Sequence, residues 1–286
     1  MAIRQITILG TGLIGGSLGL ALRQRGFAGA IVGCDKPEVL DAALTRGAID
    51  RGRTDIREAA EGSDIVVFST PVGAILSLIE RLAPTLPPGT LITDTGSTKE
   101  RIVERARLIF GAAAGMRVLP GHPMAGKEQC GIEHADAELF RDAVWLVTPI
   151  GVNQPYTVQQ QEYLDLLQSI GARVVAIDPE RHDRLCAWIS HLPQMIATAL
   201  ASMLREELGD DEAFMQIGGR ALREMTRIAH SPYSMWRDIA MTNSQNMEEA
   251  LLRFEQQLTY VRENLRGPGL RGLFESANQF GRKPTS

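Results

Sequence analysis

The feature that most constrains the fold is a regular alternation of two patterns between residue 3 and about residue 178. Short apolar runs rich in β-branched residues predict strands at 6–9, 30–35, 64–70, 90–95, 116–121, 143–149 and 172–177. Segments with helical periodicity lie between several of them, at 13–25, 37–46, 72–82, 98–110 and 156–169. Near-continuous apolar strands separated by helices predict a mostly parallel sheet with helices on both faces. The predicted class is therefore α/β, with a doubly wound sheet of the Rossmann type.

The pattern changes after Asp178. The next stretch shows helical periodicity, and no convincing strand appears in the rest of the sequence. Asp178 is suited to cap the first of these helices, because Pro179 behind it is favoured at the first helical position. We therefore expect two domains, a sheet-containing domain over residues 1–178 and an all-helical domain over residues 179–286.

The segment "ILGTGLIGGSLG" has the spacing Gly10-x-Gly12-x-x-Gly15, directly after a predicted strand and at the start of a predicted helix. In that context the spacing is typical of a dinucleotide-binding loop. Gly10 allows the tight turn, Gly12 lets a pyrophosphate approach the backbone, and Gly15 lets the helix pack on the strand. The first helical turn, with Leu13 and Ile14, offers its N–H groups to the phosphates. The alternative is that these glycines merely form a turn and bind no ligand. The strand before them, the helix after them and an acidic residue further along the sequence together disfavour it.

That acid is Asp35, which ends the second predicted strand about 20 residues after Gly15, as the dinucleotide pattern expects. A carboxylate at this position accepts hydrogen bonds from both ribose hydroxyls of NAD and repels the 2′-phosphate of NADP. Lys36 follows and softens this exclusion. The sequence therefore favours NAD without eliminating NADP.

Two later segments reach the same edge of the predicted sheet. "STPVG" (69–73) and "TDTGSTK" (93–99) each follow the end of a strand, and the ligand crevice of a doubly wound fold opens at the carboxyl ends of its strands. We therefore add three residues from these segments to the predicted cofactor-binding set: Thr70, Pro71 and Asp94.

Two loops at this edge carry residues suited to acid–base chemistry. "DTGSTK" offers Ser97, and "GHPMAG", which is too broken by Gly and Pro for a helix or a central strand, offers His122. An imidazole is a suitable base for an alcohol proton, and a serine hydroxyl can orient it. The alternatives are a loop histidine bonded to a backbone carbonyl and a serine that caps the helix beginning near Thr98. The position of the loop favours a catalytic His122 with Ser97 as its partner.

Composition narrows the partners. The formal net charge is −4 and 5% of the residues are aromatic, so neither a nucleic acid nor an anionic membrane is expected. Glycines at 10–19 interrupt the apolar N-terminal run, which argues against a membrane helix. No second ligand stands at metal-binding spacing from His122, so no metal site is expected. The scattered cysteines Cys34, Cys130 and Cys186 predict reduced thiols in a cytoplasmic protein.

These residues resemble the prephenate/arogenate (cyclohexadienyl) dehydrogenases of tyrosine biosynthesis. The matching segments run in order along almost the whole sequence: "GTGLIGGSLGLAL" (10–22), "DTGSTK" (94–99), "GHPMAGKEQCG" (121–131), "SHLPQMIATAL" (190–200) and "MTRIAHSPYSMWRDIAMTN" (225–243). The resemblance implies a Rossmann-type domain followed by an all-helical dimerisation domain, and therefore a homodimer. It also implies an NAD-dependent oxidoreductase of aromatic amino acid biosynthesis.

The reaction that the resemblance implies is the oxidative decarboxylation of prephenate to 4-hydroxyphenylpyruvate and CO2. His122 would take the proton of the ring hydroxyl as hydride leaves the same carbon, and Ser97 would hydrogen-bond both the hydroxyl and His122. Arg227 would hold a substrate carboxylate, because the planar guanidinium matches that group. Without the resemblance, Arg227 would be interpreted as a surface charge on a helix.

The resemblance leaves several roles open. His191 either contacts the substrate or makes a structural hydrogen bond, and Gln194, where some relatives carry a histidine, lies near the substrate side chain. Lys127 suits an acidic substrate but could pair with Glu128, which could itself attract the amine of arogenate. The remaining histidines show no pattern and are expected to be surface or structural residues: His134, His182 and His230.

Other functions remain as alternatives. The nearest is an enzyme that uses arogenate, or both substrates, in the same reaction. A more distant one is a non-catalytic dinucleotide-sensing protein, which the Ser97–His122 pair and the absence of a basic patch disfavour. The sequence leaves little room for an appended regulatory domain, so any inhibition by tyrosine is expected to act at the active site.

Overall fold

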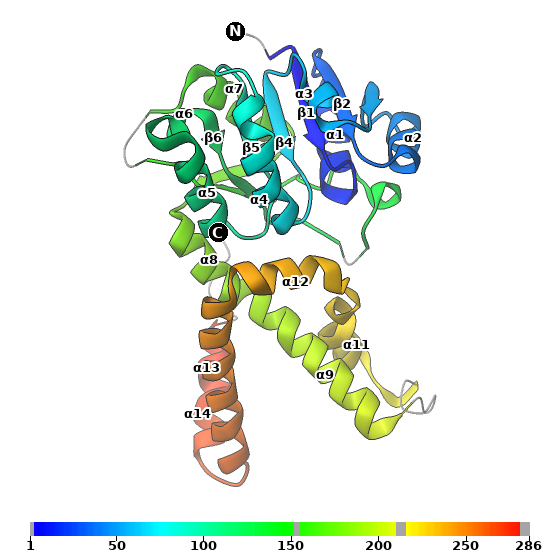
Figure 1. Ribbon diagram of the computed structural model, residues 1–286. Helices are drawn as coiled ribbons and strands as arrows, with labels where there is room; N and C mark the ends of the chain where they lie inside the picture. Colours follow the sequence, from blue (N-terminus) through cyan, green and yellow to red (C-terminus); the bar gives the residue numbers. More distant parts are fainter. Residues whose placement is uncertain (1–2, 128, 152–154, 210–215, 281–286) are drawn as a thin grey trace.

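A six-stranded parallel sheet forms the centre of the N-terminal domain in the computed structural model, which describes residues 3–127, 129–151, 155–209 and 216–280 (Figure 1). The strand order is β3-β2-β1-β4-β5-β6, so the order reverses between β1 and β4. The bounds are β1 Gln5–Leu9, β2 Ala30–Cys34, β3 Arg51–Arg53, β4 Ile65–Phe68, β5 Leu91–Asp94 and β6 Val118–Leu119. All pairings in this sheet are parallel, which confirms the predicted doubly wound class.

The central strands are buried on both faces. In β4, Ile65 and Val67 face one apolar cluster, while Val66 and Phe68 face a second cluster on the other side of the sheet. Successive side chains of a strand point to opposite faces, so a strand covered by helices on both sides is apolar throughout. This explains why the sequence "DIVVFST" shows no polar alternation.

A second sheet of three strands follows, in the order β7-β8-β9. It contains β7 (Gly121–Pro123), β8 (Val144–Val147) and β9 (Arg173–Ala176), with β7 antiparallel and β9 parallel to β8. The prediction of a loop around His122 was therefore wrong, because His122 lies in β7 opposite Leu146. The polar edge strand β3 was also not predicted, since its sequence Arg-Gly-Arg has none of the features of a strand.

The described α-helices of the N-terminal domain are α1 Leu13–Gln24, α2 Pro37–Thr45, α3 Ile56–Ala60, α4 Val72–Arg81, α5 Glu100–Phe110, α6 Ala114–Arg117 and α7 Val158–Ser169. Five of them, α1, α2, α4, α5 and α7, match the predicted segments, whereas the short helices α3 and α6 were not predicted. Helix α5 begins at Glu100, two residues later than expected from a cap at Ser97. Its first N–H groups are capped by the carboxylate of Asp183, which comes from the helical domain.

Every described secondary-structure element after β9 is helical. The α-helices are α8 Pro179–Cys186, α9 Leu192–Leu208, α11 Arg220–Thr226, α12 Tyr233–Thr242, α13 Ser244–Glu263 and α14 Gly269–Phe280. A π-helical turn over Ala187–His191 joins α8 to α9, and a 3-10 turn, Arg227–His230, joins α11 to α12. The N–H group of Arg181 donates to the Asp178 carboxylate at the start of α8, which confirms the predicted cap.

The helical domain leaves much apolar surface uncovered. Figure 1 shows α13 and α14 as one projecting arm and α9 with α11 as another. Ile189, Met203, Leu252 and Phe274 are among the exposed large apolar side chains. None of the described helices combines the length and apolar character needed to cross a bilayer.

Two acidic residues from the helical domain join it to the sheet-containing domain. Asp183 on α8 accepts hydrogen bonds from the first N–H groups of α5, and Asp238 on α12 accepts one from Gly73 N–H at the start of α4. Negative charge at a helix N-terminus interacts favourably with the helix dipole. Both contacts lie just beyond the carboxyl ends of β4 and β5, where the predicted site residues gather.

Candidate active site

The glycine-rich loop between β1 and α1 has the close contacts that its sequence predicts. Gly10 has a φ of +95°, and a Cβ atom there would lie 2.2 Å from the carbonyl oxygen of Ser69. A Cβ atom on Gly15 would lie 2.0 Å from the carbonyl oxygen of Gly10, so neither position tolerates a side chain. A Cβ atom on Gly12 would meet nothing within 4 Å, which leaves its backbone open to a ligand.

The start of α1 is suited to an anion. No side chain caps this end of the helix, and Leu13 and Ile14 in its first turn are only half-buried. Uncapped N–H groups at a helix N-terminus attract phosphate, as does the positive end of the helix dipole. Together with the open backbone at Gly12, this geometry fits the pyrophosphate of a dinucleotide.

Asp35 lies at the carboxyl end of β2, beside the glycine loop. Its two carboxylate oxygens accept hydrogen bonds from the N–H groups of Thr11 and Lys36, each 2.8 Å long. These bonds hold the carboxylate against the loop and leave lone pairs on both oxygens for ribose hydroxyls. Thr70 and Pro71 form the junction between β4 and α4, and the Thr70 hydroxyl is buried without a hydrogen-bond partner among the described residues.

Asp94 occupies a different environment from the other predicted cofactor-binding residues. It is buried at the end of β5, forms an ion pair with the buried Lys99 and accepts a 2.8 Å hydrogen bond from Gly96 N–H. Burial raises the pKa of Asp94 and lowers the pKa of Lys99, while attraction between their charges opposes both shifts. The structure therefore places Asp94 in a buried ion pair rather than at the open edge of the sheet.

His122 is held by a chain of hydrogen bonds that crosses the domain boundary. Its Nδ1 atom lies 2.9 Å from Nε2 of His182, and Nδ1 of His182 lies 2.7 Å from Oδ1 of Asp183. An ionised carboxylate only accepts hydrogen bonds, so His182 must carry its proton on Nδ1, and its Nε2 then accepts the Nδ1–H of His122. This order leaves Nε2 of His122 without a proton, as a general base requires.

The pKa shifts of the three buried histidines agree with neutral rings. Burial is the main cause that lowers the pKa of His122 well below 6.5, and the charges of His182, Lys99 and His191 add to the effect. Burial also lowers the pKa of His182, while its hydrogen bond to Asp183 acts in the opposite direction. For His191, burial lowers the pKa to about 4. His122 is therefore uncharged and able to accept a proton at neutral pH.

The partner of His122 is thus not the one that was predicted. Ser97 is half-buried and makes no hydrogen bond with another described residue, whereas His182, expected at the surface or in a structural role, is buried and bonded to His122. The available signal in the sequence was weak: a His-Asp pair in the first turns of the helix that follows the last strand. It gave no indication that α8 folds back onto β7.

The predicted substrate-binding residues lie in three places. His191 is buried within the helical domain, where its Nδ1 atom accepts a 3.1 Å hydrogen bond from Asn243. This contact corresponds to the second of its two predicted roles, a structural hydrogen bond. Gln194 donates to the Ile228 carbonyl oxygen and accepts from Ser231, which ties α9 to the turn that contains Arg227.

Lys127 lies near the surface, and its Nζ atom pairs with the carboxylate of Asp136, 3.3 Å away. It also donates to the carbonyl oxygen of His134. Glu128 lies outside the described residues. Lys127, His191 and Gln194 thus each contact other protein groups.

Two family models match the chain, and they cover most of it. One is the nucleotide-binding domain of prephenate dehydrogenase, over residues 18–176, and the other is the dimerization domain of prephenate dehydrogenase, over residues 178–278. The chain is 30% identical to a prephenate dehydrogenase of Lactococcus lactis over 91% of this chain and 70% of that protein. It is 31% identical to a cyclohexadienyl dehydrogenase of Zymomonas mobilis, with 91% and 87% covered.

A solved structure resembles the whole chain. It is the prephenate dehydrogenase of A. aeolicus in complex with hydroxyphenyl propionate and NAD+. The TM-score is 0.84 and the sequences are 30% identical, with 98% of this chain and 95% of that chain covered. The likeness therefore extends over both the sheet-containing and the helical domain.

Proposed function

The chain belongs to the prephenate dehydrogenase family, and we propose that it catalyses the NAD-dependent oxidative decarboxylation of prephenate in tyrosine biosynthesis. The products are 4-hydroxyphenylpyruvate, CO2 and NADH. One observation carries the proposal: the hydrogen-bonded chain from Asp183 through His182 to His122, which presents a bare Nε2 beside the dinucleotide-binding sheet. The L. lactis relative and the A. aeolicus complex with NAD+ support the same reaction and cofactor.

His122 acts as the general base of this reaction. Its Nε2 atom accepts the proton of the ring hydroxyl, and Asp183 acts through His182 to orient the ring and offset the charge that forms on it. Bound NAD supplies the hydride acceptor for the carbon that bears this hydroxyl. The ring carboxylate then leaves as CO2, because the product is aromatic.

The glycine loop and the edge of the sheet would hold the cofactor. The N–H groups of Gly12, Leu13 and Ile14 would bind the pyrophosphate, and Asp35 would accept from the adenosine ribose hydroxyls. Gly10 and Gly15 hold the loop in shape, and Thr70 and Pro71, at the junction of β4 and α4, would contribute to the same site. The buried Asp94 stabilises this end of β5 through its ion pair with Lys99.

Arg227 binds a carboxylate of the dianionic substrate in this proposal. It stands at the start of an exposed 3-10 turn that is tied to α9 through Gln194, which fixes the position of the turn. A guanidinium group offers paired donors to a carboxylate. Ser97, half-buried in the segment between β5 and α5, hydrogen-bonds the substrate hydroxyl in this proposal.

Arogenate is the second candidate substrate. The Z. mobilis relative is a cyclohexadienyl dehydrogenase, and the side chain of Gln194 is neutral, so it attracts neither a ketone nor an ammonium group strongly. We favour prephenate because the L. lactis relative, which matches 91% of the chain, is a prephenate dehydrogenase. Gln194 does not decide between the two substrates, since its amide group already donates to Ile228 and Thr198.

The protein acts as a cytoplasmic homodimer in this proposal, with a domain boundary at residue 178. The uncovered apolar side chains on α9, α13 and α14 and the family's dimerization domain support the dimer. Three free cysteines support a reducing compartment. Any inhibition by tyrosine acts at the active site, where the product ring binds.

The test is NADH formation by the purified protein with prephenate and, separately, with arogenate, each repeated with NADP. Turnover of prephenate with NAD, at a kcat/KM above that with arogenate, supports the proposal. A higher kcat/KM for arogenate makes arogenate the substrate. NAD binding without turnover of either acid overturns the proposal and favours a dinucleotide-sensing protein.

A further inference from the structure

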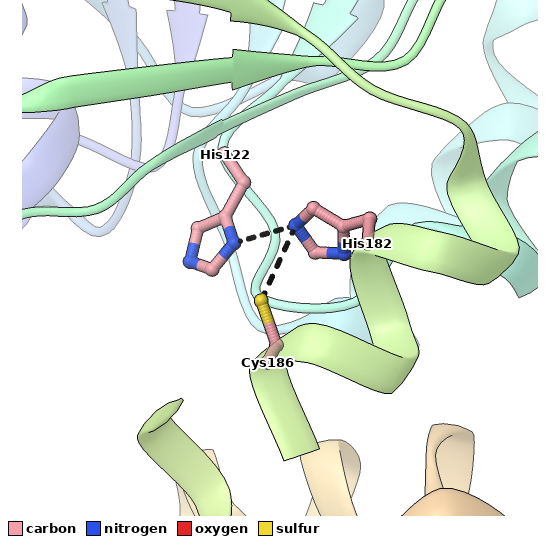
Figure 2. A group of neighbouring side chains, drawn as sticks. All are labelled: His122, His182 and Cys186. Atoms are coloured by element: carbon pink, nitrogen blue, oxygen red, sulfur yellow. Dashed lines mark hydrogen bonds between the residues drawn. The ribbon is translucent and has the colours of Figure 1, made fainter. Parts of the chain in front are cut away.

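Three side chains with metal-ligand atoms lie close together, and one of them is the proposed base. They are His122 on β7 and the pair His182 and Cys186 on α8 (Figure 2). His182 and Cys186 stand four residues apart on α8 and so share one face of the helix, which His122 meets from the sheet. Nδ1 of His122, Nε2 of His182 and Sγ of Cys186 all lie within 4.8 Å of one another. All three side chains are buried.

The distances between these atoms are close to those of a tetrahedral zinc site. Typical Zn–N and Zn–S bonds place two ligand nitrogens about 3.3 Å apart, and a nitrogen and a sulfur about 3.6 Å apart. Sγ of Cys186 lies 3.6 Å from Nε2 of His182, and Nδ1 of His122 lies 2.9 Å from the same Nε2. The third pair, Nδ1 of His122 and Sγ of Cys186, lies within 4.8 Å, so a bound cation would also require His122 to adjust its position.

The lone pairs of the three atoms also suit a cation. Because Nδ1–H of His182 donates to Asp183, Nε2 of His182 has a single lone pair, yet both His122 and Cys186 approach it. A cation inside the triangle accepts a lone pair from all three atoms at once. Burial keeps both imidazoles neutral, which is the form that binds metal.

The surroundings of the three atoms also bear on cation binding. Burial, followed by the charge of Asp183, raises the pKa of Cys186 to about 12, so a cation must displace the thiol proton. The carboxylate of Asp183 accepts a hydrogen bond from His182, and such a partner orients a metal-binding histidine.

We propose that His122, His182 and Cys186 bind Zn²⁺ or a similar borderline divalent cation, and that the bound cation switches off His122. Binding releases the thiol proton of Cys186 to solvent and requires the proton of His122 to move from Nδ1 to Nε2. His122 then presents an N–H where the reaction needs a lone pair. The inhibitory part rests on the function proposed above, whereas the binding part does not. This site could not be found from residue spacing, because His122 is 60 residues from His182.

The binding part is tested on metal-free protein titrated with Co²⁺ and then with Zn²⁺. We expect one Co²⁺ per chain, with a thiolate-to-metal charge-transfer band in the near ultraviolet and the intense visible bands of a tetrahedral site. Zn²⁺ should displace Co²⁺ and remove both sets of bands. Bound Co²⁺ without a thiolate band, or with the weak visible bands of an octahedral site, would overturn the proposal.

The variant Cys186→Ala should lose the charge-transfer band and bind Zn²⁺ at least tenfold more weakly in competition with a chelator. Cys186→Ser serves as a second variant in case the alanine variant does not fold, with NAD binding as the test of folding. The matched controls are Cys34→Ala, also buried, and Cys130→Ser, which is exposed; both should bind as the unaltered protein does. Equal Zn²⁺ affinity in Cys186→Ala and Cys34→Ala would exclude Cys186 as a ligand.

The inhibitory part is tested by NADH formation with added Zn²⁺. Inhibition of the unaltered protein should be reversed by a chelator, and Cys186→Ala should need at least tenfold more Zn²⁺ for the same loss of rate. Zn²⁺ binding without inhibition would overturn the switch but not the site. A protein that binds Zn²⁺ but never turns over either acid would refute the proposed function and leave the binding site standing.

Discussion

His122 and His182 belong to different domains, and the 2.9 Å hydrogen bond between their ring nitrogens joins the two at the proposed active site. The rings are tilted by 58° with centroids 5.1 Å apart, so they meet through the nitrogen atoms rather than by stacking. Because β7 carries one ring and α8 the other, the orientation of the base depends on how the helical domain docks. Substitutions on α8 should therefore alter catalysis without touching the substrate.

His122→Asn should lower kcat by about 10²–10⁴-fold, the usual contribution of a general base, and leave NAD binding unchanged. The asparagine amide can still donate to His182, so the buried hydrogen bond is kept while the proton acceptor is lost. NADH formation under saturating substrate and a fluorescence titration with NAD measure the two effects. His134→Asn, at a partly exposed position, is the matched control and should retain full activity. A His122→Asn rate within about threefold of the control would exclude His122 as the base.

Asp183→Asn should impair both stability and rate. The carboxylate accepts from two N–H groups of α5 and from His182, and an amide can replace only part of this acceptor set. A buried donor left without its acceptor costs about 1–3 kcal/mol in the free energy of unfolding. Urea unfolding and kcat measure the two effects.

The control for Asp183 is Asp55→Asn, which changes an exposed helix cap of the same kind at the start of α3. This variant should lose less stability and no activity. If the rates of Asp183→Asn and Asp55→Asn are equal, Asp183 acts only as a cap, and its proposed role in orienting His182 is wrong.

Lys99→Met should lower the free energy of unfolding by about 3–5 kcal/mol, because it leaves the buried carboxylate of Asp94 without a counter-charge. The double variant Lys99→Met/Asp94→Asn should recover part of this loss, since it removes the unpaired charge. Denaturant unfolding of the single and double variants gives the coupling. Arg101→Met breaks an exposed pair with Glu104 and should cost less than about 1 kcal/mol. A loss no greater for Lys99→Met than for Arg101→Met would contradict the importance of the buried pair.

The sequence was sufficient for the parts of the fold and site that depend on local pattern. Gly10, Gly12 and Gly15 indicated a turn whose geometry the structure shows, and the apolar strands indicated the parallel sheet. The pairing of His122 with His182 could not be predicted, because it depends on the docking of a helix 60 residues away. The burial of Lys99 was equally hidden, since a lysine after a serine and a threonine ordinarily indicates a solvent-exposed turn.

Asp35→Asn should shift the cofactor preference toward NADP. The variant keeps an acceptor for Thr11 N–H but removes the charge that repels a 2′-phosphate and binds ribose hydroxyls. The ratio of kcat/KM for NAD to that for NADP should fall by about 10- to 100-fold, the value of a charged hydrogen bond. Glu38→Gln removes an exposed negative charge in the first turn of α2 and should leave the ratio unchanged. An equal shift in both variants would mean that overall charge, rather than contact with Asp35, sets the preference.

Stability should fall as the pH is lowered from about 6.5 toward 4, and His191 should account for part of the fall. Its pKa is lowered from 6.5 to about 4 by burial, so between these values the unfolded chain binds a proton that the folded chain does not. Stability then rises with pH across this window and is independent of His191 above it. The shift corresponds to roughly 3 kcal/mol over the whole window.

Urea unfolding of the unaltered protein and of His191→Gln, compared at pH 7.5 and pH 5, measures this contribution. Glutamine can still accept the hydrogen bond from Asn243, but it does not titrate. Between pH 7.5 and pH 5 the His191→Gln variant should therefore lose about 2 kcal/mol less stability than the unaltered protein. At pH 7.5 and above the two proteins should show the same dependence on pH, which serves as the internal control. Parallel curves down to pH 5 would mean that His191 is protonated in the folded protein, contrary to its burial beside His182 and Trp236.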